Sequence, residues 1–335
     1  MATAALTSQP LTPAAPRRTP RWLHAVAVLT AVCAMPLLFL GAEVTTKQVG
    51  MVDQQGLRQP WHLYTLISDH LRQDGMRYFA DPSNWGLLIE HTHRTFGWIV
   101  GLCSITLALG LGFGQKRVWL RWLGVAALLA VTGQGVLGIL RVNEHVRAGP
   151  ELAMIHGCTA QLVFALLVAV AYLTSAAGED ISAGIAVDAR LSRLTFITAS
   201  LTYAQVVLGA LVRHTESAIA PRAHLLVAFA VVAGVAAVAW DYWNSSERDA
   251  RLARPLGVLI ALVALQLFLG VEAWLSKFTS GQWPQLKPLF PQPDLARSLH
   301  LLVGSLLFAA SVVVALRARL GGSPLRAARR LEGAA

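Results

Sequence analysis

The stretch Glu90-His-Thr-His-Arg94 opens a strongly apolar segment that continues over residues 95–112. A carboxylate, two imidazoles and a guanidinium therefore stand next to what looks like a membrane span. Ionisable side chains are expensive to place in a membrane, so such a group predicts a functional site. In a helix, Glu90 and His93 lie three residues apart on one face, where both can address the same bound group. The alternative is that Glu90 caps the helix while His93 and Arg94 extend to water.

The composition is typical of a protein that crosses a membrane several times. Hydrophobic residues make up 55% of the 335 residues, only 14% are charged, and the mean hydropathy is +0.53. The formal charge of +10 does not indicate nucleic acid as a partner, because Lys and Arg are spread over short segments between apolar runs. Anionic lipid and membrane orientation account for them better. The cysteines lie inside apolar runs without CxxC spacing, so neither a disulfide framework nor a zinc site is indicated.

Runs of about 20 apolar residues, the length that crosses the hydrocarbon core, predict an all-α integral membrane protein with eight transmembrane helices. Because that number is even, both termini lie on the same side. Lys and Arg gather in the tails and in the connections after the second, fourth and sixth runs, so the positive-inside rule predicts cytoplasmic termini. The predicted spans are residues 23–42, 90–112, 118–141, 152–175, 191–212, 223–243, 254–275 and 298–317.

A short motif recurs near the ends of the third, fifth and seventh runs. It reads Gln134-Gly-Val-Leu-Gly138, then Gln205-Val-Val-Leu-Gly209, then Gln266-Leu-Phe-Leu-Gly270. We interpret its Gln and Gly residues as helix-packing residues, since small residues let helix backbones approach each other. Each copy is followed by a loop and by an even-numbered run.

Every even-numbered run carries one histidine within its first few residues. These histidines are His93, His156, His224 and His300. The even-numbered helices all run in the same direction, so their imidazoles are expected at one depth near the outer leaflet. The repeat predicts two pseudo-symmetric four-helix bundles, one pairing His93 with His156 and the other pairing His224 with His300.

Two histidines on parallel helices of a four-helix unit can ligate a haem iron from both faces, while apolar walls bury the macrocycle. Haem propionates are anionic, so arginines at the same rim are expected to pair with them. Arg141, Arg147, Arg213 and Arg222 occupy suitable loops. Zinc is a weaker alternative, because close ligand spacing such as HExxH is absent from the sequence.

Several other residues have simpler interpretations. Trp98, Trp274 and Trp283 fit an interfacial aromatic belt better than a porphyrin edge. Three further histidines lie off the repeated position and are predicted to be loop residues or residues that support a ligand. They are His91, His145 and His214.

Glu90 distinguishes the two halves. The first half has a carboxylate one helical turn before its histidine, whereas the second half has Ala220 to Ala223 before His224, and Arg297 and Ser298 before His300. This asymmetry predicts a division of labour. One pair would hold a permanent electron-carrying haem, and the other would hold a haem that is chemically altered.

These residues resemble the haem A synthases, a family of cytochrome oxidase assembly proteins. Glu90 to Arg94 matches the family's Glu-x-x-His-Arg signature, and Gln205 to Thr215 resembles a second family motif. Residues 44–53 are similar to the loop after the family's first span. The resemblance extends from about Gly41 to Leu316. One departure is that residues 43–89 and 213–222 contain no cysteine, which casts doubt on thiol-based control in the first and third outer loops.

The resemblance implies a membrane monooxygenase that oxidises the C8 methyl group of haem O to a formyl group, giving haem A. His224 and His300 would ligate a resident haem b. Arg213 and Arg222 are predicted to bind the same cofactor. His93 and His156, with Arg94, would hold the substrate haem. Glu90 would be the catalytic residue that stabilises developing positive charge. The resemblance also implies a haem O synthase and oxidase assembly factors as partners, with a homo-oligomer left open.

Two other functions are compatible with the same histidines: a dihaem b-type electron-transfer protein and a haem carrier, neither of which modifies haem. The expected location is the bacterial inner membrane. The first outer loop, with Trp61, His62 and Tyr64, is hypothesised to form a lid. The expected organisation is a disordered tail over residues 1–22, a substrate-haem half over 23–175, a linker over 176–190, a haem b half over 191–317 and a second tail over 318–335.

Overall fold

The computed structural model describes residues 19–50, 69, 72–73, 75, 77–179, 189–246, 248–278, 287–290 and 292–321. Within these ranges the chain forms α-helices and one 3-10 turn, with no strand. The predicted all-α fold class is therefore confirmed. The proposed lid residues Trp61, His62 and Tyr64, together with Trp283, lie outside the described residues, as do most of both tails and most of the predicted linker.

Eight helices of the described chain are long and apolar enough to cross a membrane, which confirms the predicted number and indicates an integral membrane protein. Their ends lie a few residues beyond the predicted spans in most cases. The connections contain the short helices α4 (Arg77–Ala80) and α8 (Ala176–Glu179) and the 3-10 turn η1 (Pro82–Asn84). The long helices are α1 (Arg21–Thr46), α5 (Trp85–Gly114), α6 (Val118–Asn143), α7 (His145–Thr174), α9 (Ala189–His214), α10 (Ala220–Asn244), α11 (Ala250–Phe278) and α12 (Pro293–Gly321).

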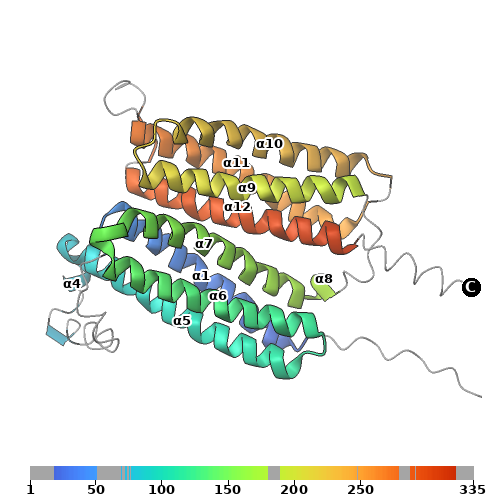
Figure 1. The fold of residues 1–335 in the computed structure, drawn as a ribbon, viewed down its shortest axis with the longest axis horizontal. Coiled ribbons are helices and arrows are strands. Elements are labelled where there is room, and N and C mark those ends of the chain that lie inside the picture. The colour runs from blue at the N-terminus through green and yellow to red at the C-terminus, as the bar shows by residue number, and fades with distance from the viewer. Residues whose placement is uncertain are drawn as a thin grey trace, which may run out of the picture.

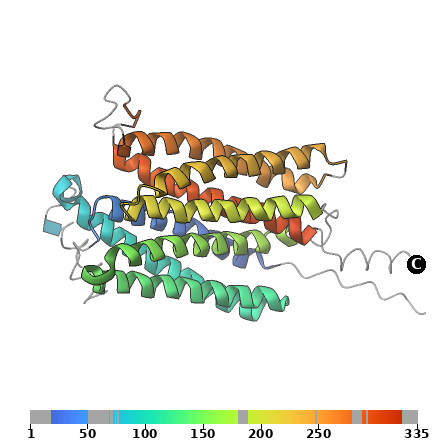
Figure 2. The ribbon, with the colours of Figure 1, turned by 45° about the horizontal axis from the view of Figure 1, so that its top comes forward.

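The long helices run alongside one another, so the chain crosses one layer repeatedly (Figures 1 and 2). Helices α1, α5, α6 and α7 contact one another in one group, and α9, α10, α11 and α12 in a second. The groups meet through α1, α7, α9 and α12. In Figure 1, α5, α7, α10 and α12 all begin at the same end of the layer. The pseudo-symmetry of the two halves and the domain boundaries stay predictions.

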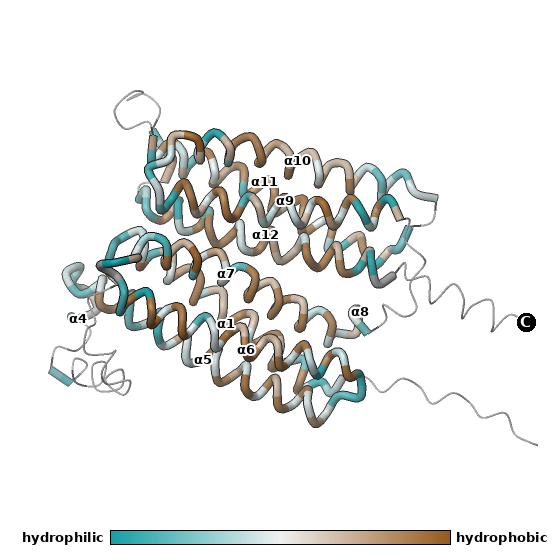
Figure 3. The backbone as a smooth tube through the Cα atoms, in the orientation of Figure 1, coloured by the Kyte–Doolittle hydropathy of each residue, from teal (hydrophilic) through white to brown (hydrophobic). Residues whose placement is uncertain are grey.

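The distribution of hydropathy suits a membrane layer. Hydrophobic residues follow the middle of the long helices and hydrophilic residues gather towards their ends (Figure 3). Large apolar side chains also face outward, including Trp98 at 61% exposure and Phe113 at 90%. Outward apolar side chains are favourable in lipid, whereas a soluble protein rarely presents so many of them together.

One apolar core cluster connects the two helix groups. It joins small residues of α1 to Phe164 of α7 and Phe308 of α12, with Tyr203 of α9 packed against it. The rings of Tyr203 and Phe308 lie 5.2 Å apart between centroids. Small residues on α1 let these aromatic side chains approach the helix closely. The two groups therefore share a packed core near the middle of the layer.

A buried ion pair lies at the opposite end of the layer from the four histidines. Arg317 of α12 is fully buried, and both its Nε, at 2.7 Å, and its Nη2 donate to Oδ2 of Asp249. Arg317 Nη1 also donates to the carbonyl oxygen of Ala177 in α8. The charge of Arg317 is therefore neutralised by an ion pair inside the protein.

Candidate functional site

Helix α5 carries the acidic part of the candidate site. Asp81 starts the preceding turn by accepting hydrogen bonds from the backbone N–H and the hydroxyl of Ser83, and these bonds lower the pKa of Asp81. The helix then begins at Trp85, with no acidic residue in its first turn. Glu90 lies more than one turn inside α5, so the interpretation of Glu90 as a helix cap is wrong.

Glu90 is buried, with 2% of its surface exposed. Arg94 lies one helical turn later, and its Nη2 donates to Glu90 Oε1 at 2.6 Å. Arg141 of α6 also lies within electrostatic range of Glu90. A carboxylate is thus kept away from water beside two guanidinium groups, in a place where burial without a partner would be costly. Arg94, which was predicted to bind the substrate haem, contacts the carboxylate directly.

His93 lies on the same helix, three residues after Glu90. Its Nδ1 lies 3.0 Å from the carbonyl oxygen of Leu37 in α1. A carbonyl oxygen only accepts, so Nδ1 must carry the proton and Nε2 keeps its lone pair. The ring packs on Gly41, where a Cβ atom would lie 2.9 Å from His93 Cε1. Helix α1 therefore presents His93 in the tautomer that can ligate a metal through Nε2.

His156 of α7 is the predicted partner of His93. His93 and Arg141 both lie within electrostatic range of it. The amide group of Gln134 in α6 lies 3.1 Å from His156 Nδ1 and 3.3 Å from its carbonyl oxygen. An amide offers both a donor and an acceptor, so Gln134 can match either tautomer of the imidazole. The two histidines and Glu90 thus share one neighbour, Arg141.

The two histidines of the C-terminal pair, His224 and His300, lie close together. The rings of His224 in α10 and His300 in α12 lie 6.3 Å apart between centroids, with an angle of 72° between their planes. Two imidazoles that bind one iron through nitrogens at about 2 Å would place their ring centres roughly 6 Å apart. The observed separation fits such a shared ligand, and the two rings come from helices that begin at the same end of the layer.

Polar atoms around this pair are buried without hydrogen bonds to any described residue. Nδ1 of both His224 and His300 is in this state, as is Oε1 of both Gln205 and Gln266. Unsatisfied buried polar atoms cost free energy, so they are rare in folded proteins unless another group completes the site. Four such atoms around two facing imidazoles fit a site that receives a bound group.

Basic side chains meet at the end of the two helix groups that carries the four histidines and that is predicted to be the outer end. Arg213 of α9 donates through Nη2 to the carbonyl oxygen of Ala42 and to Thr46 Oγ1, both at 2.6 Å. Arg141 donates to Thr45 Oγ1 at 3.2 Å. Arg213 lies within electrostatic range of Arg141 and of Arg297 in α12. We call Arg141, Arg213, Lys277 and Arg297 the outer basic cluster, since Lys277 in turn interacts with Arg213 and Arg297.

The two other predicted rim arginines are not in this cluster. Arg222 is exposed and lies only two residues before His224 on α10, so it leaves the helix on a different side. Arg147 is largely exposed and pairs with Glu144 at 3.7 Å. Of the four arginines that the sequence placed at the rim, the structure brings Arg141 and Arg213 together.

Another buried carboxylate near the histidines, Glu272, was missed by the sequence analysis. Glu272 of α11 is 3% exposed and lies two residues after Gly270. Its Oε2 accepts the backbone N–H groups of Leu289 at 2.8 Å and Phe290 at 3.1 Å. These hydrogen bonds hold residues 289–290, which precede α12, against Glu272. The signal was present, because an acidic residue inside an apolar run is as unusual there as at Glu90.

The histidines off the repeat differ from one another. His91 is fully buried inside α5, so the prediction of a loop position is wrong for it. His214 ends α9 and lies within electrostatic range of Arg213, Arg141 and Lys277. His145 begins α7. Zinc gains no support, since the described residues contain no group of three or more histidine, cysteine or acidic side chains that could hold a metal ion.

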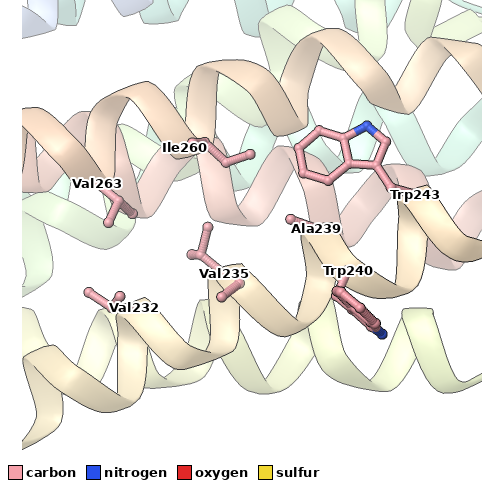
Figure 4. A pocket seen from close by; sticks show the side chains of 8 residues that line it. Val232, Val235, Ala239, Trp240, Trp243, Ile260 and Val263 are labelled. Carbon is pink, nitrogen blue, oxygen red and sulfur yellow. The ribbon is translucent and has the colours of Figure 1, made fainter.

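An apolar groove lies apart from the histidines, between α10 and α11 (Figure 4). It begins two helical turns beyond His224 and continues towards the opposite end of the layer. All of its lining side chains are aliphatic or aromatic, so it offers no acid, base or metal ligand. They are Val232, Val235, Ala236, Ala239, Trp240, Trp243, Ile260 and Val263.

The sequence model of the cytochrome oxidase assembly protein family matches residues 83–223. This match covers less than half of the 335 residues and supports the predicted resemblance to that family. The matched segment contains Glu90, His93, Arg94 and His156, and it ends one residue before His224. The family implies a role in the assembly of cytochrome oxidase. Comparisons with curated proteins and with solved structures found no match.

Proposed function

We propose that the protein is a haem A synthase that oxidises the C8 methyl group of haem O to a formyl group. The observation that carries this proposal is Glu90, a carboxylate buried in α5 beside His93 and inside the matched family segment. Electron transfer alone does not require a buried acid on the face of one histidine. An enzyme that develops positive charge on its substrate gains directly from such a group.

In this proposal His93 and His156 hold the substrate haem. The hydrogen bond from His93 Nδ1 to Leu37 leaves Nε2 available as a ligand. Arg94 fixes the Glu90 carboxylate through the 2.6 Å contact, so the negative charge is oriented before the reaction starts. Surrounding apolar helices exclude water, which strengthens electrostatic stabilisation of a developing cation.

The reaction requires four electrons to be removed from the methyl carbon. With dioxygen as the oxygen source, each of two hydroxylations consumes one dioxygen, two protons and two donor electrons and releases one water. The resulting diol loses a further water to give the formyl group. Glu90 is suited to stabilise positive charge at the methyl carbon during these steps or to accept its proton.

In the second helix group, His224 and His300 are proposed to hold haem b, which when bound supplies electron transfer. Their ring separation and the buried unsatisfied atoms around them support this role. Arg141 and Arg213 of the outer basic cluster are suited to pair with haem propionates, because guanidinium groups bind carboxylates strongly. Arg222 is less suited because it lies outside that cluster.

The proposed location is the bacterial inner membrane, with both termini cytoplasmic. The proposed partners are a haem O synthase, which supplies the substrate, and factors that assemble the oxidase. Lipid surrounds the outward apolar faces of the helices, and a homo-oligomer is compatible with this arrangement.

The test is to co-express the full chain with a haem O synthase and to identify extracted haems by mass analysis. We expect haem A together with haem b. Haem b alone, with haem O left unchanged, would favour a dihaem electron-transfer protein. Haem O bound without haem b and without oxidation would favour a carrier.

A further inference from the structure

Each of the four histidines lies against a glycine of the preceding long helix. A Cβ atom added to any of these glycines would lie 3.6 Å or less from the imidazole Cε1. Such a Cβ atom would be too close to the ring at Gly41, tight at Gly209 and Gly270, and in ordinary van der Waals contact at Gly138. The pairs are Gly41 with His93 (2.9 Å), Gly138 with His156 (3.6 Å), Gly209 with His224 (3.1 Å) and Gly270 with His300 (3.2 Å).

The residue four positions before each glycine contacts the same histidine. At the first histidine it is Leu37, through its carbonyl oxygen; at the other three it is a glutamine side chain. Four positions correspond to about one helical turn, so both residues lie on the helix face turned towards the imidazole. The contacts are Leu37 O to His93 Nδ1 (3.0 Å), the Gln134 amide to His156 Nδ1 (3.1 Å), Gln205 Nε2 to the His224 carbonyl oxygen (2.8 Å) and Gln266 Nε2 to His300 Nε2 (3.3 Å).

Where α11 meets α12, each helix places a polar side chain against a glycine of the other helix. His300 packs on Gly270 of α11, while Gln266 of α11 packs on Gly304 of α12. A Cβ atom on Gly304 would lie 3.1 Å from Gln266 Nε2. Since Gly304 is one turn after His300, the imidazole and the amide lie side by side, each over a glycine of the opposite helix. Neither can turn freely without moving the other.

We propose that each of these glycines, with the residue four positions before it, is the positioning element that sets the orientation of the following histidine. The proposal rests on haem ligation by the histidines, and it revises our interpretation of the motif as simple helix packing. Metal-binding histidines are commonly oriented by a hydrogen bond to their other nitrogen. Here a glycine lies against each ring, and a polar group contacts Nδ1 of His93 and of His156 and Nε2 of His300. At His224 the glutamine instead holds the backbone carbonyl oxygen of the histidine.

The positioning elements are not equivalent. Leu37 offers only a carbonyl oxygen, so it fixes His93 with a protonated Nδ1. A glutamine amide can donate or accept, so Gln134 and Gln266, which contact ring nitrogens, can follow a change in the imidazole, whereas Gln205 contacts the carbonyl oxygen of His224. His93, three residues after Glu90 on α5, is therefore the one of the four held in a single tautomer.

The test uses the full chain purified with its haem b and compares Gly270→Ala and Gln266→Leu with wild type. The matched control is Gly257→Ala, on the same helix, where an added Cβ has nothing within 4 Å. The readouts are haem b per protein and the low-spin electron paramagnetic resonance signal, whose g values depend on the angle between the imidazole planes. We expect both variants to shift that signal and to bind haem b roughly 10-fold more weakly or worse, with Gly257→Ala unchanged.

Wild-type signals and full haem content in both Gly270→Ala and Gln266→Leu would overturn the positioning role. If Gly270→Ala does not elute as a folded protein in detergent, Gln266→Leu decides, because it keeps nearly the same volume. His300→Ala separates this question from the proposed function. Persistence of the low-spin signal in that variant would show that His300 is not a ligand, whatever the motif does.

Discussion

Arg94 Nη2 lies 2.6 Å from Glu90 Oε1, one turn apart on α5, and the carboxylate side chain is almost completely buried. Removing one partner of a buried pair leaves the other charge uncompensated, which costs more than the pair itself contributes. We therefore expect Arg94→Leu to destabilise the protein by roughly 3 kcal/mol, with Glu90→Gln combined with Arg94→Leu recovering part of the loss. Thermal unfolding in detergent measures both, and equal stability of Arg94→Leu and wild type would contradict the pairing.

The two histidine pairs are expected to respond differently to substitution. His224→Ala or His300→Ala should remove the low-spin haem b spectrum, because each removes one of two facing imidazoles. His93→Ala should leave that spectrum mostly intact. Absorption spectra of the purified variants, normalised to protein, make the comparison. Equal loss in all the variants would contradict the division between the two halves.

Arg213 and Arg222 form a matched pair of arginine substitutions. Arg213 is hydrogen-bonded to α1 and lies in the outer basic cluster, whereas Arg222 is exposed. We expect Arg213→Leu to lower retained haem b and the melting temperature, since it removes a charge proposed to pair with the propionates and two hydrogen bonds between helix groups. Arg222→Leu should change both little. The same loss of haem b in the two variants would restore Arg222 to the cofactor site.

Much of the fold follows from the sequence because a membrane span is set by length and hydropathy. The eight helices could be predicted for that reason, and the four histidines could be found because they recur after the same motif. The exposed position of Arg222 was also readable, since two residues along a helix turn a side chain far from His224. Arg222 was predicted to lie at the haem rim because of its position in a loop at that end of the helices.

Other features depend on contacts between elements far apart in the chain. The carbonyl group of Leu37 carries no sequence signal, yet it fixes the tautomer of His93. Glu272 could be recognised as unusual, but its partners in residues 289–290 are backbone groups that any sequence supplies. The Gln and Gly motif was visible as a repeat. Its contacts with the imidazole rings required the helix rotations that only the structure provides.

The central claim is that the Glu90 carboxylate is required for the oxidation of haem O to haem A. The most direct measurement is mass analysis of haem extracted from Glu90→Gln and from wild type, each co-expressed with a haem O synthase. Gln keeps the shape of the side chain and removes its charge, so we expect haem A to fall by about 100-fold or more while haem b and its low-spin spectrum stay at the wild-type level. Haem A at the wild-type level in Glu90→Gln would contradict the account.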